Sequence, residues 1–176
     1  MPLQPRVPEL LRTPSGRIEL APAMLLADLP RAEAALHETP ADLVVIGRRD
    51  VRSNNSWMHN LPLLAKGPFR GTALLHPQDA QRFGVMNGGQ AQLSNAHGSV
   101  QVQIEISDSV MPGVLSLPHG CGHDLPGTRL SVAAPRPGAN LNVLLDINDR
   151  DPLSGNAVLS GAAVSLRAVS MAETTT

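Results

Sequence analysis

Residues 87–110, NGGQAQLSNAHGSVQVQIEISDSV, alternate apolar and polar side chains on both sides of a short polar turn. In the second half, the even positions from Val100 to Ile106 are all apolar, and Gln or Glu stand between them. Successive side chains of a strand point to opposite faces, so this spacing predicts a strand with one buried face. The turn at 95–98, Asn-Ala-His-Gly, joins it to a preceding strand. A half-buried antiparallel hairpin is therefore the clearest element that the sequence predicts.

Three further elements precede this hairpin. The run DLVVIG at 42–47 is apolar, β-branched and stopped by glycine, which is typical of a buried strand. The run GTALLHPQDAQRFGV predicts a strand at 73–75 and then a short helix. Pro77 suits the first turn of that helix, and Gly84 suits a left-handed stop.

After the hairpin, the run GVLSLP at 113–118 predicts another short strand. The run AVLSGAAVSLRAV at 157–169 predicts a pair of strands that turn at residues 160–161. Closely spaced strands with one or two short helices indicate a small barrel rather than a doubly wound sheet. The sequence thus predicts a mainly β fold with a few short helices.

The two ends of the chain differ from this central region in composition and periodicity. Residues 1–40 are rich in proline and poorly periodic, with one short helix expected at 31–37, and they predict a connecting arm. Residues 41–170 hold the strand patterns and are the predicted domain. The last six residues, 171–176, predict a frayed tail.

Composition excludes several classes of protein. Of the 176 residues, 42% are apolar and 16% are charged, as expected for a globular protein, and no apolar run is long enough to span a membrane. A formal net charge of −1 provides no global field for nucleic acid, so any anion site must be local. The one cysteine, Cys121, excludes an internal disulfide and a cysteine-based zinc or iron–sulfur site in this chain. A reducing compartment fits, and we expect a cytoplasmic location.

A basic cluster follows the strand expected at 42–47. After Gly47 come Arg48, Arg49 and Arg52, offset only by Asp50. A guanidinium group presents a planar fork of donors that matches phosphate oxygens in pairs, so this cluster could hold a pyrophosphate. A solvated basic loop is the alternative.

An amide-rich segment follows the basic cluster. Asn54, Asn55 and Ser56 supply donors and tolerate turn geometry, which suits a loop around a polar ligand. The only tryptophan of the chain, Trp57, comes next. If the loop were merely solvated, this indole would be an isolated hydrophobic side chain.

The segment SLPHGCGHD places His119 and His123 on either side of Cys121. Two glycines and a proline argue against a helix, so the spacing does not place both imidazoles on one face, and no third metal ligand lies nearby. A histidine flanked by glycine is better interpreted as a loop donor where backbone approaches a ligand closely. We therefore predict no metal site.

The segment GANLNVLLDINDRDPLSG carries Asn and Asp residues on both sides of a short apolar run. Such residues can read the donor edge of a purine, and they also cap helices and build turns. The chain has no GxSxG, GxGxxG or P-loop motif and no paired carboxylates, so we predict no catalytic residue.

Taken together, these segments resemble the C-terminal cofactor-binding domain of the molybdopterin oxidoreductases, the group that includes dimethyl sulfoxide reductase and formate dehydrogenase. Their order and spacing across most of the chain make coincidence unexpected. The matching segments are TPSGRIEL at 13–20, LVVIGRR at 43–49, RSNNSWMHN at 52–60, HPQDAQRFGV at 76–85, VMPGVLSLPHGCGH at 110–123 and ANLNVLLDINDRDPLSG at 139–155.

The resemblance implies a six-stranded double-psi β-barrel whose loops contact bis-(molybdopterin guanine dinucleotide). It also implies that Trp57 is held where the cofactor loop folds back on the barrel. The residues that it marks as cofactor-binding are Gly47, Arg48, Arg49, Arg52, Asn54, Asn55, Ser56, Trp57, His59, Asn60, His119, Gly120 and Asn140.

Members of that family hold molybdenum or tungsten with residues that this chain lacks. The resemblance therefore implies a domain that is inactive alone and whose partners are the remaining domains of a parent oxidoreductase, with no nucleic acid or membrane partner. Two alternatives stay open at this point. One is a freestanding double-psi barrel that serves as a protein-interaction or adaptor module. The other is a metal-dependent hydrolase built on His119 and His123.

Overall fold

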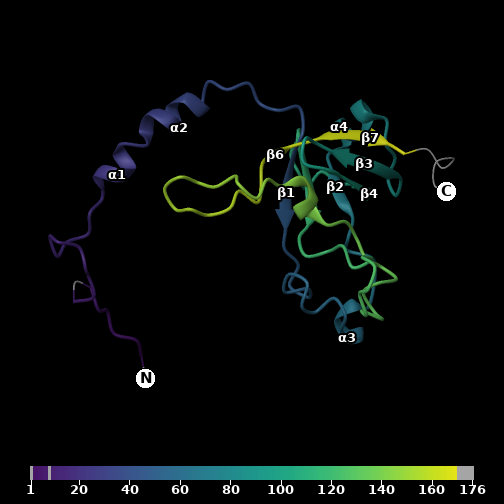
Figure 1. Cartoon of the computed structure of the whole chain (residues 1–176), viewed down its shortest axis with the longest axis horizontal. Helices are drawn as coiled ribbons and strands as arrows, with labels where there is room; N and C mark the ends of the chain where they lie inside the picture. The colour runs from purple at the N-terminus through teal and green to yellow at the C-terminus, as the bar shows by residue number, and fades with distance from the viewer. Residues whose placement is uncertain (1, 8, 170–176) are drawn as a thin grey trace. The chain divides into compact units, whose positions relative to one another are not determined.

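Seven short strands form one sheet in the computed structural model, which describes residues 2–7 and 9–169. Their order in the sheet is β6-β1-β5-β2-β4-β3-β7. Figure 1 shows where β1, β2, β3, β4, β6 and β7 lie along the chain. The strands are β1 (Val44–Arg48), β2 (Ala73–Leu75), β3 (Gln90–Ser94), β4 (Ser99–Ile106), β5 (Val114–Pro118), β6 (Ala162–Ala163) and β7 (Ser165–Ala168). The helices are α1 (Ala23–Leu26), α2 (Leu29–Ala35), α3 (Pro62–Ala65), α4 (Pro77–Phe83) and the 3₁₀ helix η1 (Leu141–Leu144).

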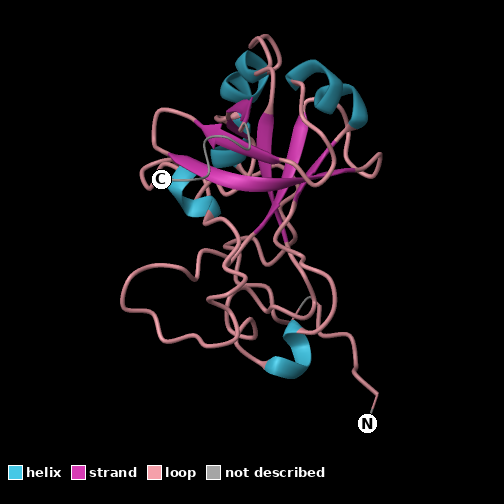
Figure 2. Ribbon diagram, turned by 90° about the vertical axis from the view of Figure 1, so that its right-hand side faces the viewer, coloured by secondary structure: helices cyan, strands magenta, loops and turns pink. Residues whose placement is uncertain are grey.

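The two edges of this sheet are joined by the chain itself. Only Val164 separates β6, which pairs with β1, from β7, which pairs with β3. The sheet therefore curls into a nearly closed barrel, and Figure 2 shows its strands gathered into one curved layer. The predicted mainly β barrel with few helices is confirmed.

The hairpin is the element that the sequence defines most clearly, and it forms as predicted. β3 and β4 pair antiparallel, with Ala91 opposite Val102 and Leu93 opposite Val100. Ile104 is fully buried and Val102 nearly so, whereas the Gln and Glu residues between the apolar positions are exposed or half-buried. The alternation therefore marks the face that packs on the core.

The core is almost entirely aliphatic. Leu43, Val45, Leu75, Leu115 and Leu117 come from or beside β1, β2 and β5, and they are essentially inaccessible to solvent. With aromatic residues at 2% of the chain, branched aliphatic side chains must fill this interior. β1 and β5 are parallel neighbours, and each has a second strand on its other side, so both are held within the sheet.

Helix α4 begins and ends where the sequence predicts. The His76 ring nitrogen Nδ1 accepts a hydrogen bond from the backbone N–H of Gln78 at 3.1 Å, and Pro77 occupies the first turn. Gly84 ends the helix in the left-handed conformation, with φ of +65°.

We expect Gly84→Ala to lower the free energy of unfolding by about 1 kcal/mol, because a Cβ disfavours this backbone conformation. No atom lies within 4 Å of the position that the Cβ would take, so the loss reports backbone strain alone. Urea unfolding measures it. Gly84→Asn should lose less, since asparagine tolerates left-handed backbone. An equal loss for both variants would contradict this account.

The prediction of a strand pair at 157–169 is wrong for the first of the two strands. Ala157 forms an antiparallel bridge with Arg150, and the Val158 N–H donates to the Asp149 carbonyl at 3.1 Å. The residues at 160–161 therefore do not turn one strand onto the next; the Gly161 N–H donates to Val45 of β1 instead. The preceding Asp- and Asn-rich segment supplies the pairing partner for 157–158.

The described chain divides into two units. The first holds residues up to Thr39 together with Pro152–Gly155, and the second holds the barrel. In the first unit, α2 begins at Leu29 and ends at Ala35, two residues before the helix predicted at 31–37. The predicted tail at 171–176 lies outside the described residues. Among the described helices, none is both long and apolar enough to cross a bilayer.

Candidate functional site

Two of the predicted loops leave the barrel side by side. β1 and β5 run parallel with Arg48 opposite Pro118, so the loops that follow them start at the same edge. The His119 N–H donates to the Arg48 carbonyl at 3.0 Å, which extends the pairing by one residue. The basic and amide-rich loop at 49–60 therefore lies beside the loop at 119–124.

Glycines allow these loops to touch through their backbones. Gly120 has φ of +92°, and a Cβ there would lie 2.5 Å from the carbonyl carbon of Asn55. Asn54 and Asn55 themselves have φ of 42° and 59°, an uncommon pair of left-handed residues that asparagine tolerates. A Cβ on Gly122 would lie 2.6 Å from the Cβ of Asn140, so the segment before η1 joins the same group.

A pocket opens between the two loops, α3 and the segment at 132–136. One part of its wall is basic and the other is apolar. Of the residues predicted to bind a cofactor, Arg48, Arg52, His59 and His119 line it. The full lining is Arg48, Asp50, Arg52, Ser53, Met58, His59, Leu64, Ala65, Pro68, Phe69, Arg70, Gly71, Pro118, His119, Cys121, Val132, Ala133 and Arg136.

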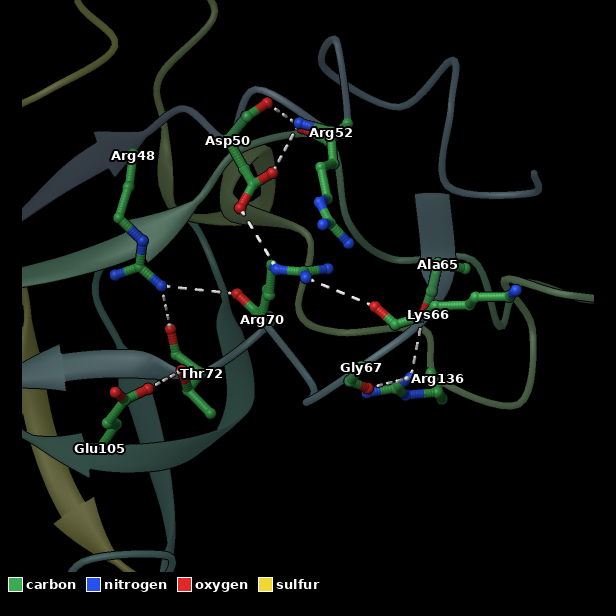
Figure 3. A network of polar contacts seen from close by, with 11 residues as sticks. Arg48, Asp50, Arg52, Ala65, Lys66, Gly67, Arg70, Thr72, Glu105 and Arg136 are labelled. Atoms are coloured by element: carbon green, nitrogen blue, oxygen red, sulfur yellow. Dashed lines mark hydrogen bonds and ion pairs between the residues drawn. The ribbon is translucent and has the colours of Figure 1, made fainter. Parts of the chain in front are cut away.

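Arg48 directs its guanidinium group at the protein backbone (Figure 3). Its Nη2 donates to the Thr72 carbonyl at 2.8 Å and its Nη1 to the Ser116 carbonyl at 3.0 Å, with a longer contact to the Arg70 carbonyl at 3.5 Å. Burial lowers the pKa of this guanidinium, and Glu105 and Asp50 oppose that change. Arg48 therefore ties β1 to β5 and to the residues that lead into β2.

Two further arginines of the pocket are also held by the protein. Arg136 donates to the carbonyls of Ala65 and Gly67, each within 3.3 Å, and its guanidinium carbon lies 5.5 Å from the Phe69 ring centre. Arg70 donates to the Lys66 carbonyl at 3.4 Å (Figure 3). These contacts fix the segment around α3 as one wall of the pocket.

Asp50 holds the start of the 49–60 loop. One carboxylate oxygen accepts from the Arg52 backbone N–H at 2.7 Å, and the other lies 3.8 Å from Arg70 Nε. The guanidinium groups of Arg49 and Arg52 have no partner among the described residues, and both side chains are exposed. Arg49 and Arg52 thus have donors that remain available for an anion.

His59 and His123 form a contact that the sequence did not reveal. His59 Nδ1 lies 2.6 Å from His123 Nε2, and the rings meet edge to face at 83°. Burial lowers the pKa of both imidazoles, and the pKa of His119 is lowered by burial and by Arg49. All three rings are consequently held towards the neutral form.

We expect the free energy of unfolding to fall as the pH drops below about 6.5, the ordinary histidine value. The unfolded chain then binds protons that the folded His59, His119 and His123 resist, so protonation favours unfolding. Urea unfolding at about pH 7.5 and about pH 5.5 measures the change. A variant with Gln at both 59 and 123 should show a smaller decrease. An equal decrease in both proteins would assign the effect to other groups.

The structure corrects the expectation for Trp57. Its side chain is 82% exposed, so it does not anchor the loop to the barrel. That role falls to Asn60, whose Oδ1 accepts from the N–H groups of Val132 and Ala133 at 2.9 and 3.2 Å. An amide side chain can cap two adjacent backbone donors in this way, whereas an indole ring has only one polar atom.

The outer members of the predicted set lie around the pocket rather than on its wall. The Gly47 N–H donates to Ser160 Oγ at 3.2 Å, and β1 continues one residue beyond it. Asn140 uses its side chain to accept from the Asn142 N–H, which caps η1. Gly47 and Asn140 therefore make hydrogen bonds near the starts of these segments and do not line the pocket.

Sequence reasoning missed the second basic and apolar wall. Arg70, Arg136 and Phe69 come from segments without a recognisable motif, and only their positions in the fold bring them to the loops. In the structure the Phe69 ring packs against Gly71, where a Cβ would lie 2.2 Å from the ring, a contact that the sequence alone does not indicate.

No metal-binding group forms in the described part of the chain: no cluster of three or more His, Cys, Asp or Glu side chains is arranged to hold an ion. His123 pairs with His59 and not with His119. Cys121 lines the pocket half-buried, and burial raises the pKa of its thiol. The arginine and histidine side chains that line the pocket can donate hydrogen bonds, and the arginines are cations.

Comparisons with known proteins show which family the chain resembles. Residues 43–163 match the family described as "Molydopterin dinucleotide binding domain". The chain is 36% identical over 87 residues to a tetrathionate reductase protein of Salmonella typhimurium, a match that covers 44% of this chain and 8% of that protein. It is also 36% identical over 86 residues to biotin sulfoxide reductase of Cereibacter sphaeroides, a match that covers 48% of this chain and 11% of that protein.

The fold has a counterpart among solved structures. Acetylene hydratase from Pelobacter acetylenicus superposes with a TM-score of 0.65 at 22% sequence identity, over 88% of this chain and 24% of that one. At this identity the likeness concerns the fold alone. The chain spans no more than about a quarter of the length of the proteins named here.

Proposed function

The chain belongs to the molydopterin dinucleotide binding domain family, and from that premise we propose that the pocket between the 49–60 and 119–124 loops is where it contacts its cofactor. The cofactor that the family implies is bis-(molybdopterin guanine dinucleotide), and the chain is a cofactor-binding domain of an oxidoreductase. The observation that carries the site is Arg52, which lines a pocket with an apolar wall and whose guanidinium group has no described protein partner. Arg49, also without a described partner, lies in the same loop.

The residues present fit such a ligand. The diphosphate of a dinucleotide is an anion, and guanidinium groups with available donors bind phosphate oxygens in pairs. Gly120 lets the backbone of the 49–60 loop pack directly against the loop at 119–124, which holds the two loops together beside the pocket. Met58, Leu64 and Phe69 supply apolar surface for a planar ring. When bound, the cofactor supplies the two-electron redox chemistry, and this domain contributes orientation and electrostatics.

We assign the direct anion contacts to Arg49, Arg52 and His119, and a supporting role to Arg48. The Arg48 guanidinium already donates to Thr72 and Ser116, so binding an anion would break contacts that hold the strand ends. The amide-rich residues Asn54, Asn55 and Ser56 remain proposed contacts through their exposed side chains, as does the exposed Trp57.

We expect Arg52→Ala to weaken binding of guanosine diphosphate, which carries the guanosine and diphosphate portion of the cofactor, by about tenfold. The loss corresponds to one charged hydrogen-bonding contact, about 1.5 kcal/mol. Isothermal titration calorimetry on the folded chain measures it. The free energy of unfolding should stay within about 0.5 kcal/mol of wild type, because the side chain is exposed.

Arg17→Ala is the matched control, since Arg17 is an exposed arginine of the unit that does not contain the pocket. It should leave the affinity unchanged. Equal losses in Arg17→Ala and Arg52→Ala would remove the site assignment. Absence of binding to both guanosine diphosphate and the intact dinucleotide would remove the proposed pocket altogether.

The finer fold assignment is part of the proposal. We propose that the barrel is the six-stranded double-psi type, with β6 and β7 counted as one strand bent at Val164. Two parallel pairs, β1 with β5 and β2 with β4, support crossing connections. We propose further that residues 41–170 form the cofactor-binding domain and residues 1–40 a connecting arm.

The remaining domains of a parent oxidoreductase are the proposed partners, and they would hold molybdenum or tungsten. The support is the small share of each relative that this chain covers, such as 8% of the tetrathionate reductase protein. A cytoplasmic location and the absence of nucleic-acid and membrane partners stay predictions that rest on composition.

A further inference from the structure

The His59–His123 pair joins the two loops of the pocket by one hydrogen bond. His59 belongs to the 49–60 loop and lines the pocket, whereas His123 belongs to the loop after β5 and is only 8% exposed. Their ring nitrogens lie 2.6 Å apart, so one ring must donate and the other accept. The edge-to-face arrangement at 83°, with ring centres 4.9 Å apart, is consistent with that bond.

The pair is placed where it can control His59. The same two loops also meet at Gly120, where a Cβ would lie within 2.8 Å of backbone atoms of Asn55 and Ser56. Ring orientation and tautomer in a histidine are set by the bond that its other nitrogen makes. A buried partner such as His123 has little freedom to adjust, so it imposes its own geometry on His59.

Resting on the proposed function, we propose that His123 is a positioning residue of the cofactor pocket: it fixes the ring and tautomer of His59, and through that ring it holds the 49–60 loop in the binding arrangement. One shared hydrogen suffices for this bond. The bond requires a hydrogen on one of the two facing nitrogens and none on the other, so it selects one combination of tautomers, and protonation of both rings breaks it because neither nitrogen can then accept.

Other charged groups around the pair affect the protonation of its two rings. Asp50 faces His59 and Asp124 faces His123, and each carboxylate favours the protonated form of its neighbour. Burial opposes protonation in both rings and is the larger effect. The cations Arg48 and Arg52 and the imidazole of His119 line the same pocket as His59. The pair should therefore be neutral and bonded near pH 7.

The test is a two-bond ¹H–¹⁵N correlation spectrum of the histidine rings in the ¹⁵N-labelled chain without ligand. In wild type, His59 should show a single fixed tautomer. In His123→Phe it should show the average of two tautomers, and its titration should move up towards that of an ordinary histidine. In His123→Gln the amide can replace the ring as hydrogen-bond partner, so the fixed tautomer should return. His97→Phe, at the exposed hairpin turn, is the matched control and should leave His59 unchanged.

Binding of guanosine diphosphate at about pH 7.5, where the rings are neutral, supplies the second readout. We expect about tenfold weaker binding in His123→Phe and recovery to within about threefold in His123→Gln. An averaged tautomer of His59 in wild type, or a tautomer and titration unchanged in His123→Phe, would overturn the proposal. Because the spectrum is recorded without ligand, it decides the role of His123 even if guanosine diphosphate does not bind and the proposed function fails.

Discussion

Gly120→Ala is expected to lower the free energy of unfolding by about 2–3 kcal/mol more than Gly127→Ala. Both glycines have nearly the same backbone conformation, with φ of +92° and +88°, so both variants carry a similar left-handed penalty of about 1 kcal/mol. They differ in their surroundings. A Cβ on Gly120 would lie 2.5 to 2.8 Å from backbone atoms of Asn55 and Ser56, whereas nothing lies within 4 Å of one on Gly127.

The additional loss arises because backbone cannot move aside as a flexible side chain can. Relief requires the 49–60 loop to shift away from the loop at 119–124, which would also separate His59 from His123. We therefore expect binding of guanosine diphosphate to fall more than about tenfold in Gly120→Ala and to remain near wild type in Gly127→Ala. Urea unfolding and calorimetry on the two variants give both numbers. Similar stability of the two proteins would show that the loops do not depend on this close approach.

Arg48→Ala is expected to lower the free energy of unfolding by about 2–4 kcal/mol. The guanidinium group donates to carbonyls at the entrance to β2 and in β5, at 2.8 and 3.0 Å, and its removal leaves these partly buried acceptors without that partner. A hydrogen bond to a charged group contributes about 1.5–3 kcal/mol, and an orphaned acceptor adds a desolvation penalty. For a chain of this size the melting temperature should fall by about 4–16 °C.

Arg49→Ala is the matched control for this stability measurement, because Arg49 is the adjacent residue, carries the same charge and is exposed. It should change the free energy of unfolding by less than about 0.5 kcal/mol. Arg48→Lys should recover only part of the loss, since an ammonium group cannot reach two carbonyls with one planar fork. Equal stability of Arg48→Ala and Arg49→Ala would show that the observed contacts contribute little, and would return Arg48 to the set of direct anion ligands.

Figure 3 shows how Arg48 differs from Arg52. Arg48, Arg70 and Arg136 are linked to backbone carbonyls, and Arg70 also to Asp50, whereas the Arg52 side chain extends without a drawn contact. In the sequence, Arg48, Arg49 and Arg52 are equivalent members of one basic cluster. Their different roles follow from which side chain points along the strand edge and which points into solvent.

Some features of the fold could be predicted because short stretches of the sequence determine them. The alternation at 99–106 identifies the buried face of β4 without reference to any neighbour. Pro77 and Gly84 bracket α4 because their backbone preferences act locally.

Other features depend on contacts between segments far apart in the chain. The run at 157–158 has the composition of a hairpin strand, but Arg150 and Asp149 compete successfully for its hydrogen bonds. Trp57 is apolar and was expected to pack on the barrel, yet Asn60 does the anchoring because its amide satisfies two backbone donors at once.

The sequence by itself determined the mainly β class, the hairpin, the limits of α4 and the family resemblance, because periodicity, turn residues and ordered motifs are local properties of the chain. Only the tertiary structure decided which arginine supports the barrel and which is exposed to solvent, and that His59 meets His123 from 64 residues away. The physical reason is that a hydrogen bond depends on the position of both partners. A sequence pattern specifies the donors and acceptors that are present, and folding selects the pairs that they form.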